Sequence, residues 1–431
     1  MYNLPEKFIQ RMKKQLPSSE WEAFFSCYQN TAVKGVRINT LKGDRYALKA
    51  LLPFLDEQIA WEGNGYYTSL EKVGANPFHS AGIFYSQEPS AMFIAPKLEV
   101  KAGEHVLDLC SAPGGKATQL ASQMQGEGIL VANEPVFSRA KILSQNIERM
   151  GVKNAVVTCE TPDSLAKKFP AYFDKILVDA PCSGEGMFRK NADEALKEWS
   201  EENVELCATR QKEILQNAIV MLKKGGRLAY STCTFAPQED EEMVAWIVQT
   251  YPQMRLIAQE KLYPHKVKGE GHFFALFEKT EGDERELRPI KPWCSAPAEK
   301  AYRAFEKEFF HQKFAENLHE ANGVLYDIPK GVFSWQGLQV LRVGVRLGEI
   351  KNGRFEPNHS LALCVKSEDL KNALNLTQTD ARVEKYLRGE TVEGELKNGW
   401  CAVCVEGYPL GLGKAVNGII KNHLPKGLRK N

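Results

Sequence analysis

Two cysteines and an aspartate stand where this sequence could bring them together for chemistry. Asp179 and Cys182 follow the apolar run 176–178, and Cys233 follows the largely apolar run 227–230. A cysteine is usually a small buried hydrophobe. Ligands of parallel α/β sheets, however, bind beyond the carboxyl ends of the strands. The position of Cys182 and Cys233 after predicted strands therefore favours a chemical role for the pair.

The reaction that suits a thiol beside a carboxyl is methylation of a pyrimidine ring carbon. Cytosine C5 is a poor nucleophile until a group adds to C6, and a thiolate is well suited to that addition. A carboxyl that shares a proton with N3 would turn the ring into an enamine that accepts a methyl group at C5. The C5 proton must then leave and the thiol must be eliminated, so a second acid–base group has to assist release. Methylases of exocyclic amines commonly carry an Asp/Asn-Pro-Pro-aromatic turn at this place, whereas this turn supplies a thiol and a carboxyl.

A glycine-containing loop, residues 108–119, follows the first apolar run and leads into a predicted helix. Gly114 and Gly115 permit a tight turn and a close approach of the backbone to a ligand. The free N–H groups at the start of the helix suit a carboxylate or phosphate, but the spacing is not that of the phosphate loop. Glu134 ends the next apolar run, where an acidic residue accepts hydrogen bonds from ribose hydroxyls. The pattern predicts a cofactor that contains an unphosphorylated nucleoside.

Short apolar runs alternate with helix-like segments around these motifs. The apolar runs are 106–109, 129–132, 155–157, 176–178 and 227–230, and the helix-like segments include 138–150 and 203–222. This alternation predicts a parallel α/β sheet over residues 91–285. Helical spacing in residues 5–31 predicts two short helices, and an irregular stretch to about residue 90 completes a small N-terminal domain.

The last third of the sequence has a different pattern. Residues 280–300 are charged and contain prolines, as in a linker, and segments such as 340–345 alternate in polarity like strands of one or two small β-rich modules. Cys401 and Cys404 have the spacing of half a zinc site, but an ordinary strand is the better interpretation and we expect no metal. Residues 411–431 carry five lysines or arginines and no acidic residue, which suits either phosphate contacts or a solvated basic tail.

The composition of the 431 residues narrows the class of protein. A hydrophobic fraction of 43% without an apolar run long enough for a bilayer span excludes a membrane protein and a disordered chain. Residues 1–7 lack the features of a secretory signal, and ten scattered cysteines fit reduced thiols, so we expect a cytoplasmic protein. The net charge of +2 means that any nucleic-acid surface must be local. We expect a monomer that does not associate with membranes.

These motifs together resemble the Sun (Nol/Nop/Sun) family of RNA cytosine-5 methyltransferases. The resemblance rests on residues 108–119, 179–186 and 231–234, and it extends to residues 36–42 and 87–91. The last third looks like the extension of the bacterial 16S rRNA branch, with a PUA-like module that includes residues 407–414. The resemblance implies an α/β fold: a Rossmann-like S-adenosylmethionine methyltransferase core, a small α+β N-terminal domain, and a β-rich, PUA-like C-terminal region.

The resemblance also implies domain boundaries. An N-terminal RNA-binding domain would take residues 1–90, the catalytic domain residues 91–285, a linker and first C-terminal module residues 286–370, and the PUA-like module residues 371–431. The substrate would be rRNA, from the small-subunit 16S molecule or the subunit itself. Two alternatives stay open: a tRNA cytosine-5 methyltransferase, and a non-catalytic RNA-binding factor of ribosome assembly, against which the presence of both cysteines argues.

In the family the cysteine of the Thr-Cys-Thr/Ser motif, here Cys233, is the nucleophile, and that of the Asp-Ala-Pro-Cys motif, here Cys182, helps to release the product. Asp179 would lie between cofactor and cytosine. The implied contacts to S-adenosylmethionine are Cys110, Ser111, Ala112, Pro113, Gly114, Gly115, Lys116, Glu134 and Asp179. Family members commonly place an aspartate after the third strand to receive the adenine amine. Here Glu160 has the chemistry to receive the adenine amine in place of that aspartate, although strict spacing favours Thr161.

Overall fold

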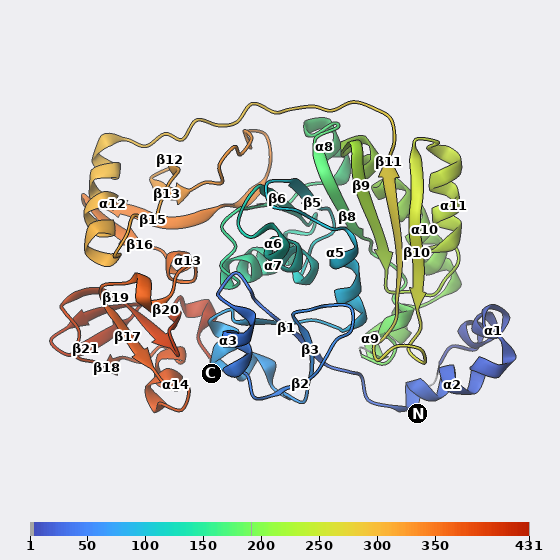
Figure 1. The fold of residues 1–431 in the computed structure, drawn as a ribbon, viewed down its shortest axis with the longest axis horizontal. Coiled ribbons are helices and arrows are strands. Elements are labelled where there is room, and N and C mark those ends of the chain that lie inside the picture. The colour runs from blue at the N-terminus through green and yellow to red at the C-terminus, as the bar shows by residue number, and fades with distance from the viewer. Residues whose placement is uncertain (1–3, 191, 431) are drawn as a thin grey trace.

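A mixed sheet of eight strands, in the order β10-β11-β9-β8-β5-β6-β7-β14, forms the centre of the molecule (Figure 1). The structure, a computed structural model, describes residues 4–190 and 192–430. The five apolar runs are confirmed as parallel strands: β5 (His105–Asp108), β6 (Ile129–Asn133), β7 (Ala155–Thr158), β8 (Phe173–Asp179) and β9 (Leu222–Thr232). The loops with the predicted chemistry therefore all leave the same edge of the sheet.

Three antiparallel strands, which the sequence pattern did not predict in this sheet, complete it at its edges. They are β10 (Met254–Leu262), β11 (His272–Lys279) and β14 (Val340–Val343). The connection between β10 and β11 contains no crossover helix, and a connection of this kind joins antiparallel neighbours. Because β11 runs against β9, it begins at the edge where β9 ends.

Helices cover both faces of the sheet. They are α5 (Ile94–Lys97), α6 (Gly115–Met124) and α7 (Phe137–Arg149) on one face, and α8 (Pro162–Lys168), α10 (Glu201–Met221) and α11 (Glu241–Thr250) on the other. Neighbouring residues of β5 point to opposite faces, as in any strand. Val106 belongs to the core with Leu143 of α7, whereas Leu107 belongs to the core with Leu215 of α10. Each face therefore has its own apolar core.

The first ninety residues form two separate parts. The predicted helices are confirmed as α1 (Glu6–Gln15) and α2 (Trp21–Ser26), and they pack on Phe188, Trp199 and Phe235, near α9 (Ala192–Glu198). The stretch read as irregular contains a four-stranded antiparallel sheet with two short helices. These elements are β1 (Gly35–Ile38), α3 (Arg45–Ala50), β2 (Leu55–Gln58), β3 (Gly65–Thr68), α4 (Pro77–Ser80) and β4 (Phe84–Ser86). Strands of three or four residues are too short to show a periodicity in the sequence.

Two further sheets follow the catalytic region. Residues 280–295 contain no regular element, as a linker would, but α12 (Ala296–Phe309) begins within the stretch expected to be a linker. The first sheet consists of β12 (Leu318–Ala321), β13 (Val324–Asp327), β15 (Val345–Lys351) and β16 (Arg354–Pro357), and α13 (His359–Ala362) follows it. The second contains β17 (Ala373–Leu376), α14 (Ala381–Leu387), β18 (Val392–Glu393), β19 (Gly399–Val405), β20 (Tyr408–Val416) and β21 (Ile419–Asn422). Cys401 and Cys404 lie buried within β19.

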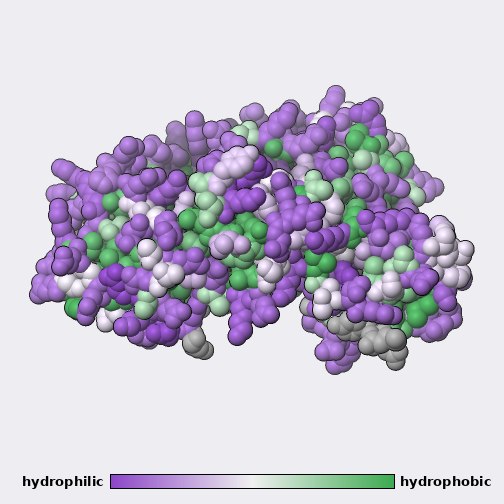
Figure 2. Space-filling model, turned by 60° about the horizontal axis from the view of Figure 1, so that its bottom comes forward, coloured by the Kyte–Doolittle hydropathy of each residue, from purple (hydrophilic) through white to green (hydrophobic). Residues whose placement is uncertain are grey.

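Short 3-10 turns complete the secondary structure. They lie at Ser18–Glu20, Cys27–Gln29, Val73–Ala75, Ser90–Phe93, Glu185–Met187, Ser367–Asp369 and Lys426–Leu428. Among the residues that the structure describes, no helix has the length and apolar character of a membrane span. Figure 2 shows hydrophobic residues on one face as patches among hydrophilic ones. Residues 1–3 of the segment considered for a secretory signal, and Asn431 of the basic segment, lie outside the described residues.

The expectation that residues 340–345 are strands of one or two small C-terminal β-rich modules is correct for Val345 but wrong for Val340–Val343. Val340–Val343 is β14 and pairs with β7 in the central sheet, whereas Val345 begins β15 in the next sheet. Gly344 lies between them with φ +55, and a Cβ atom there would lie 2.2 Å from the carbonyl oxygen of Asp327. The chain can therefore pass from one sheet to the other only through a residue without a side chain.

The C-terminal third also shares a core with the N-terminal sheet. Val36 and Phe78 belong to one apolar cluster with Tyr386 and Val403. The basic segment takes part in this contact, because Lys430 Nζ donates to the carbonyl oxygen of Ala75 at 3.0 Å. At least this residue of the segment is tied to the protein rather than forming a solvated tail.

The passage between the sheets can be tested at Gly344. We expect Gly344→Ala to lower the free energy of unfolding by about 2 to 4 kcal/mol, because it combines left-handed backbone strain with a steric clash. Gly331→Ala is the matched control: Gly331 has φ +78 but no atom within 4 Å of its Cβ position, so it should cost only about 1 kcal/mol. Urea unfolding followed by circular dichroism measures both. Equal losses in the two variants would contradict the assigned close contact.

Candidate active site

A cavity of about 640 Å³ opens at the carboxyl ends of the parallel strands. It is lined by Leu109, Cys110, Ala112, Glu134, Pro135, Val136, Arg139, Thr161, Pro162, Asp163, Asp179, Ala180, Pro181, Cys182, Arg210, Glu213, Ile214, Asn217 and Cys233. The loops after β5, β6, β7, β8 and β9 all contribute, and one face of α10 forms the opposite wall. A cavity with apolar walls and a few convergent polar groups is typical of a small-molecule site.

The two predicted cysteines meet at this cavity. Asp179 of β8 is paired in register with Ser231 of β9, so the loops that follow the two strands leave the sheet side by side. The Sγ atoms of Cys182 and Cys233 lie 3.2 Å apart, and the backbone N–H of Cys233 donates to Cys182 Sγ at 3.3 Å. The contact with Cys233 and burial together hold the pKa of the Cys182 thiol well above its usual value. Cys182 therefore remains protonated beside its neighbour.

The loops that carry the cysteines are held by buried hydrogen bonds. The backbone N–H of Ser183 donates to Glu239 Oε2 at 3.0 Å, and the hydroxyls of Ser183 and Thr234 lie 2.8 Å apart. The backbone N–H of Gly186 donates to the carbonyl oxygen of Cys233 at 2.8 Å. These bonds join the two loops directly, so the sulfur-to-sulfur distance is fixed by the backbone on both sides.

Asp179 lies at the centre of a polar cluster beside the cysteines. Lys116 Nζ lies 2.7 Å from Asp179 Oδ2, and the hydroxyl of Ser231 donates to Oδ1 at 2.7 Å. His272 Nε2 lies 3.5 Å from Oδ1 and 3.4 Å from Lys116 Nζ. Burial by itself would raise the pKa of Asp179, but Lys116 and His272 outweigh it and hold the pKa below its usual value. Asp179 is therefore a carboxylate at neutral pH.

The sequence motifs do not indicate His272, and they give Lys116 only a place near the cofactor. His272 begins β11, which was not predicted as a strand, although the run Phe273-Phe274-Ala275-Leu276-Phe277 is a strong apolar signal. The ring is buried, with 4% of its surface exposed. Because an antiparallel strand begins where its parallel neighbour ends, the first residue of β11 reaches the same edge as Asp179. Phe273 is paired in register with Thr232.

The loop after β5 offers free backbone donors and a free carboxylate oxygen. Gly114 is the N-cap of α6 with φ 111, and no side chain caps the helix. Asp108 is fully buried, and its Oδ2 accepts from the hydroxyl of Ser111 at 3.0 Å. In the described residues its Oδ1 has no hydrogen-bond partner. The free helix terminus suits the carboxylate of an amino acid, and the buried Asp108 suits its cationic groups.

Glu134 is positioned to contact a ligand in the cavity from the end of β6. Its side chain is buried, and Oε1 accepts from the backbone N–H of Val136 at 3.0 Å. Arg139 Nη2 lies 3.4 Å from Oε2. The carboxylate is thus oriented by one backbone bond and lines the cavity where ribose hydroxyls are expected. The loop and Glu134 together fit the predicted S-adenosylmethionine.

Of the remaining predicted cofactor residues, Cys110 and Ala112 line the cavity and the others do not. Ser111, Pro113, Gly114, Gly115 and Lys116 do not line the cavity; they shape the loop, and Lys116 holds Asp179. Glu160 does not line the cavity either, so the structure does not support its assignment to the adenine amine. Its Oε1 accepts from the backbone N–H of Gln339 at 2.6 Å and its Oε2 from the hydroxyl of Ser164 at 2.7 Å.

The neighbouring residue Thr161 does line the cavity, as strict spacing had indicated. Its hydroxyl accepts from the backbone N–H of Ser164 at 3.2 Å and caps α8. Gln339, the residue before β14, donates its backbone N–H to the carboxylate of Glu160. Nothing in the sequence near Glu160 indicates that β14 lies there.

Two N-terminal motifs support the site from behind. Arg37 of β1 is buried, and its Nη2 donates to the carbonyl oxygen of Gly115 at 3.1 Å and to the hydroxyl of Thr118 at 2.8 Å. Glu88 Oε1 accepts from the backbone N–H of Glu270 at 2.9 Å, two residues before His272. The N-terminal sheet therefore holds both the start of α6 and the loop that carries His272.

Comparison with families of known proteins covers nearly the whole chain. Residues 95–278 match the family described as 16S rRNA methyltransferase RsmB/F, and residues 4–89 match the N-terminal domain of 16S rRNA methyltransferase RsmF. Residues 304–365 match the RsmF rRNA methyltransferase first C-terminal domain, and residues 373–430 match the methyltransferase RsmF PUA domain.

Individual relatives are similar over their full length. The ribosomal RNA small subunit methyltransferase F of Shewanella piezotolerans is 32% identical, over 100% of this chain and 98% of the relative. The protein of the same name from Enterobacter sp. is 31% identical, over 98% of this chain and 95% of the relative.

Two solved structures share the fold. A methyltransferase homolog protein from Pyrococcus horikoshii is 25% identical with a TM-score of 0.57, over 64% of this chain and 95% of that one. NSun6 from the same organism, solved with SFG, is 21% identical with a TM-score of 0.57, over 65% of this chain and 100% of that one.

The cavity makes a first prediction for Glu134. We expect Glu134→Gln to weaken binding of S-adenosylmethionine by about 1 to 3 kcal/mol, because charge-assisted hydrogen bonds to ribose hydroxyls are lost. Isothermal titration calorimetry measures the affinity. Glu213→Gln is the control, since Glu213 lines the same cavity from α10 but is exposed. Equal losses in both variants would indicate a general charge effect and remove the specific role of Glu134.

The second prediction concerns pH. Burial raises the pKa of Asp108 to about 7, against the opposing hydrogen bond from Ser111. A cationic cofactor favours the carboxylate, so S-adenosylmethionine should bind more tightly as pH rises from about 6 to 8, with release of a proton. Asp108→Asn should remove this part of the pH dependence, whereas Asp163→Asn at the cavity wall should retain it. Calorimetry in buffers of different ionisation enthalpy counts the protons. An unchanged proton count in Asp108→Asn would exclude Asp108 as the titrating group.

Proposed function

Because this chain belongs to the ribosomal RNA small subunit methyltransferase F proteins of the Sun family, we propose that it methylates C5 of cytosine in small-subunit rRNA through a covalent cysteine adduct. Family membership establishes the coarser activity: the protein is an rRNA methyltransferase that uses S-adenosylmethionine. The observation that carries the finer proposal is the pair of sulfur atoms 3.2 Å apart beside Asp179.

The two cysteines differ in a way that supports separate roles. Cys182 is held as a thiol by its contact with Cys233 and by burial, which raise its pKa. The S–H of a protonated Cys182 can donate to the Cys233 sulfur 3.2 Å away, and we assign Cys182 as the donor of this pair. Cys233 is then the group that adds to C6. The same logic disfavours a non-catalytic binding protein, which has no use for two thiols in contact at a cofactor cavity.

The polar cluster supplies what the addition needs. When the Cys233 sulfur bonds to C6, negative charge moves to N3, and a proton must neutralise it. Asp179 is a carboxylate with Lys116 at 2.7 Å, so in our proposal the ammonium proton passes through Asp179 to N3. His272 and Ser231 keep the carboxylate in place. Asp179 would then share with N3 a proton that comes from Lys116.

Product release reverses these steps after methyl transfer. Bound S-adenosylmethionine supplies an electrophilic methyl group to C5. In our proposal Cys182, whose sulfur reaches the same cavity, gives its own proton to the departing Cys233 sulfur 3.2 Å away and takes the C5 proton in exchange. The electron pair of the C5–H bond expels the Cys233 sulfur from C6, and N3 returns its proton. The target base must leave its stack to meet these groups.

The choice of rRNA over tRNA is supported by the relatives, whose names specify the small ribosomal subunit. Incubation with labelled S-adenosylmethionine and separate pools of 16S rRNA, small subunits and tRNA tests this choice. Methyl transfer to tRNA alone would overturn it.

The two cysteine roles give opposite kinetic results. Cys233→Ala should abolish methylation and form no covalent RNA complex, because no bond to C6 can form. Cys182→Ala should still allow attack and methyl transfer but lower turnover by about 10²- to 10⁴-fold, the usual contribution of an acid–base group. A protein–RNA adduct that survives denaturing electrophoresis should therefore accumulate in Cys182→Ala.

Cys207→Ala serves as a control for cysteine removal near the site, since Cys207 lies buried in α10 and does not line the cavity. It should turn over like the native protein. An adduct in Cys233→Ala but not in Cys182→Ala would exchange the two roles. Loss of activity in both variants without any adduct would exclude a release step for Cys182.

A further inference from the structure

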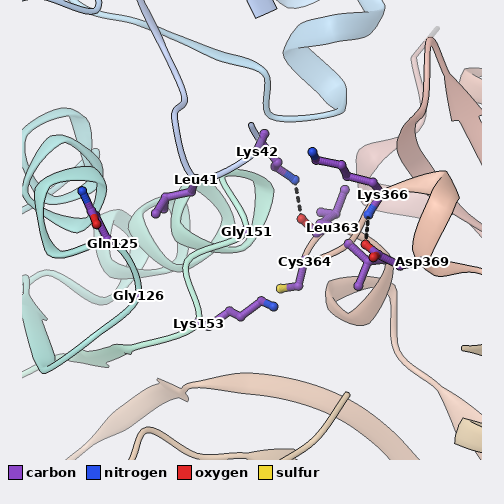
Figure 3. Close-up of a pocket in the computed structure, with 11 residues that line it drawn as sticks. Leu41, Lys42, Gln125, Gly126, Gly151, Lys153, Leu363, Cys364, Lys366 and Asp369 are labelled. Atoms are coloured by element: carbon purple, nitrogen blue, oxygen red, sulfur yellow. Dashed lines mark hydrogen bonds between the residues drawn. The ribbon is translucent and has the colours of Figure 1, made fainter. Parts of the chain in front are cut away.

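A second pocket, of about 300 Å³, lies at the opposite edge of the central sheet (Figure 3). Gly126 precedes β6, and Gly151 and Lys153 precede β7, so the pocket adjoins the amino ends of these strands. The cofactor cavity adjoins their carboxyl ends. The ten residues of α6 separate the two sites, which corresponds to about 15 Å of helix. The second pocket is thus no part of the candidate active site.

Three lysines from separate parts of the chain line this pocket. Lys42 follows the N-terminal strand β1, Lys153 lies between α7 and β7, and Lys366 follows α13. Figure 3 shows Lys153 directed toward Cys364, Lys42 toward the carbonyl oxygen of Leu363, and the amine of Lys366 toward Lys42. The one carboxylate in the lining, Asp369, accepts from the backbone N–H of Lys366 at 2.8 Å. The pocket therefore carries an excess of positive charge.

Among these three lysines, Lys42 has the least compensation from nearby negative charge. Its side chain is buried, with 5% of its surface exposed, and its ammonium group donates to the carbonyl oxygen of Leu363. Burial is the main cause that lowers the pKa of Lys42 to about 8; Cys364 opposes this shift, and the cations of Arg149 and Lys153 add to it. Within residues 4–190 and 192–430, no carboxylate forms an ion pair with Lys42 or Lys153. A buried ammonium without a counter-charge is costly.

The backbone keeps this space open and close to Lys42. Gly151 has φ +70, and a Cβ atom there would lie 2.5 Å from the carbonyl oxygen of Leu363 and 3.2 Å from Lys42 Nζ. Lys366 has an exposed partner, Glu368, at 3.6 Å, and Lys153 lies 4.8 Å from the ring centre of Phe314. These weak contacts leave both amines able to turn toward a ligand.

We propose that this pocket binds a phosphate group, either one in the backbone of the RNA substrate or a free phosphate ion. Lysine is a compact charge with three donors, and several lysines around one tetrahedral oxyanion satisfy both partners. The pocket is large enough for a phosphate with a few water molecules. Its position places a bound phosphate among the N-terminal sheet, the catalytic sheet and the C-terminal modules. The phosphate site does not depend on the cysteine mechanism.

The test uses the full chain with Lys153→Gln, Lys366→Gln and the double variant. Lys42 is left unchanged because it also bonds Leu363. Lys101→Gln is the control, since Lys101 is exposed on the same domain and does not line the pocket. Inorganic phosphate at constant ionic strength should raise the unfolding temperature of the native protein and the control. For the double variant, the phosphate concentration that gives the same rise in unfolding temperature should be at least tenfold higher.

A second arm measures affinity for 16S rRNA against salt concentration. If the phosphate belongs to RNA, the slope of log affinity against log salt should fall by about 0.7 to 0.9 for the lost contact, and the control should keep its slope. A response to inorganic phosphate alone assigns the pocket to the free ion, and a change of RNA slope assigns it to the backbone. Neither response, or the same losses in Lys101→Gln, would overturn the proposal. None of these readouts requires methyl transfer.

Discussion

The register between β8 and β9 is the constraint on which the active site depends. Asp179 and Ser231 are paired across these strands, and the chain continues from each into a loop with a cysteine. A shift of this register by one residue would move every side chain of one strand to the other face. The cysteine sulfurs would separate, and Ser231 would no longer reach Asp179. Catalytic geometry in this protein is thus set by backbone hydrogen bonds before any side chain contributes.

Electrostatics then assigns a protonation state to each group. Burial raises the pKa of Asp179, and Lys116 with His272 outweighs that effect. Within the part of the chain that the structure describes, Asp108 forms no ion pair, and burial raises its pKa to about 7. Two carboxyl groups at one edge of the sheet therefore differ in charge because, among the described residues, only Asp179 has a cationic partner within 3 Å. This contrast is the usual way in which a single fold obtains groups with different acid–base properties.

The sequence predicted what local pattern can specify. Five apolar runs became the parallel strands, and the residues at their carboxyl ends became the cavity wall with Cys182, Cys233, Asp179 and Glu134. It did not predict contacts made by distant segments. His272 arrives on a strand antiparallel to β9. Glu160 is bonded by Gln339, 179 residues further along the chain, because β14 pairs with β7. Such pairings leave no periodicity near the residues that they affect.

The position of β14 has a consequence for how the protein is made. The edge strand β7 ends at Thr158, but its partner β14 begins at Val340, so a ribosome must add all of the intervening chain before the sheet can be closed. Until then the backbone N–H and C=O groups on the open side of β7 are unpaired, and a strand in this state can pair with the wrong partner. Lys430 must also arrive before it can bond Ala75. Folding of the nascent chain is therefore completed late, through contacts of long sequence separation, and a chain released early would expose an open edge.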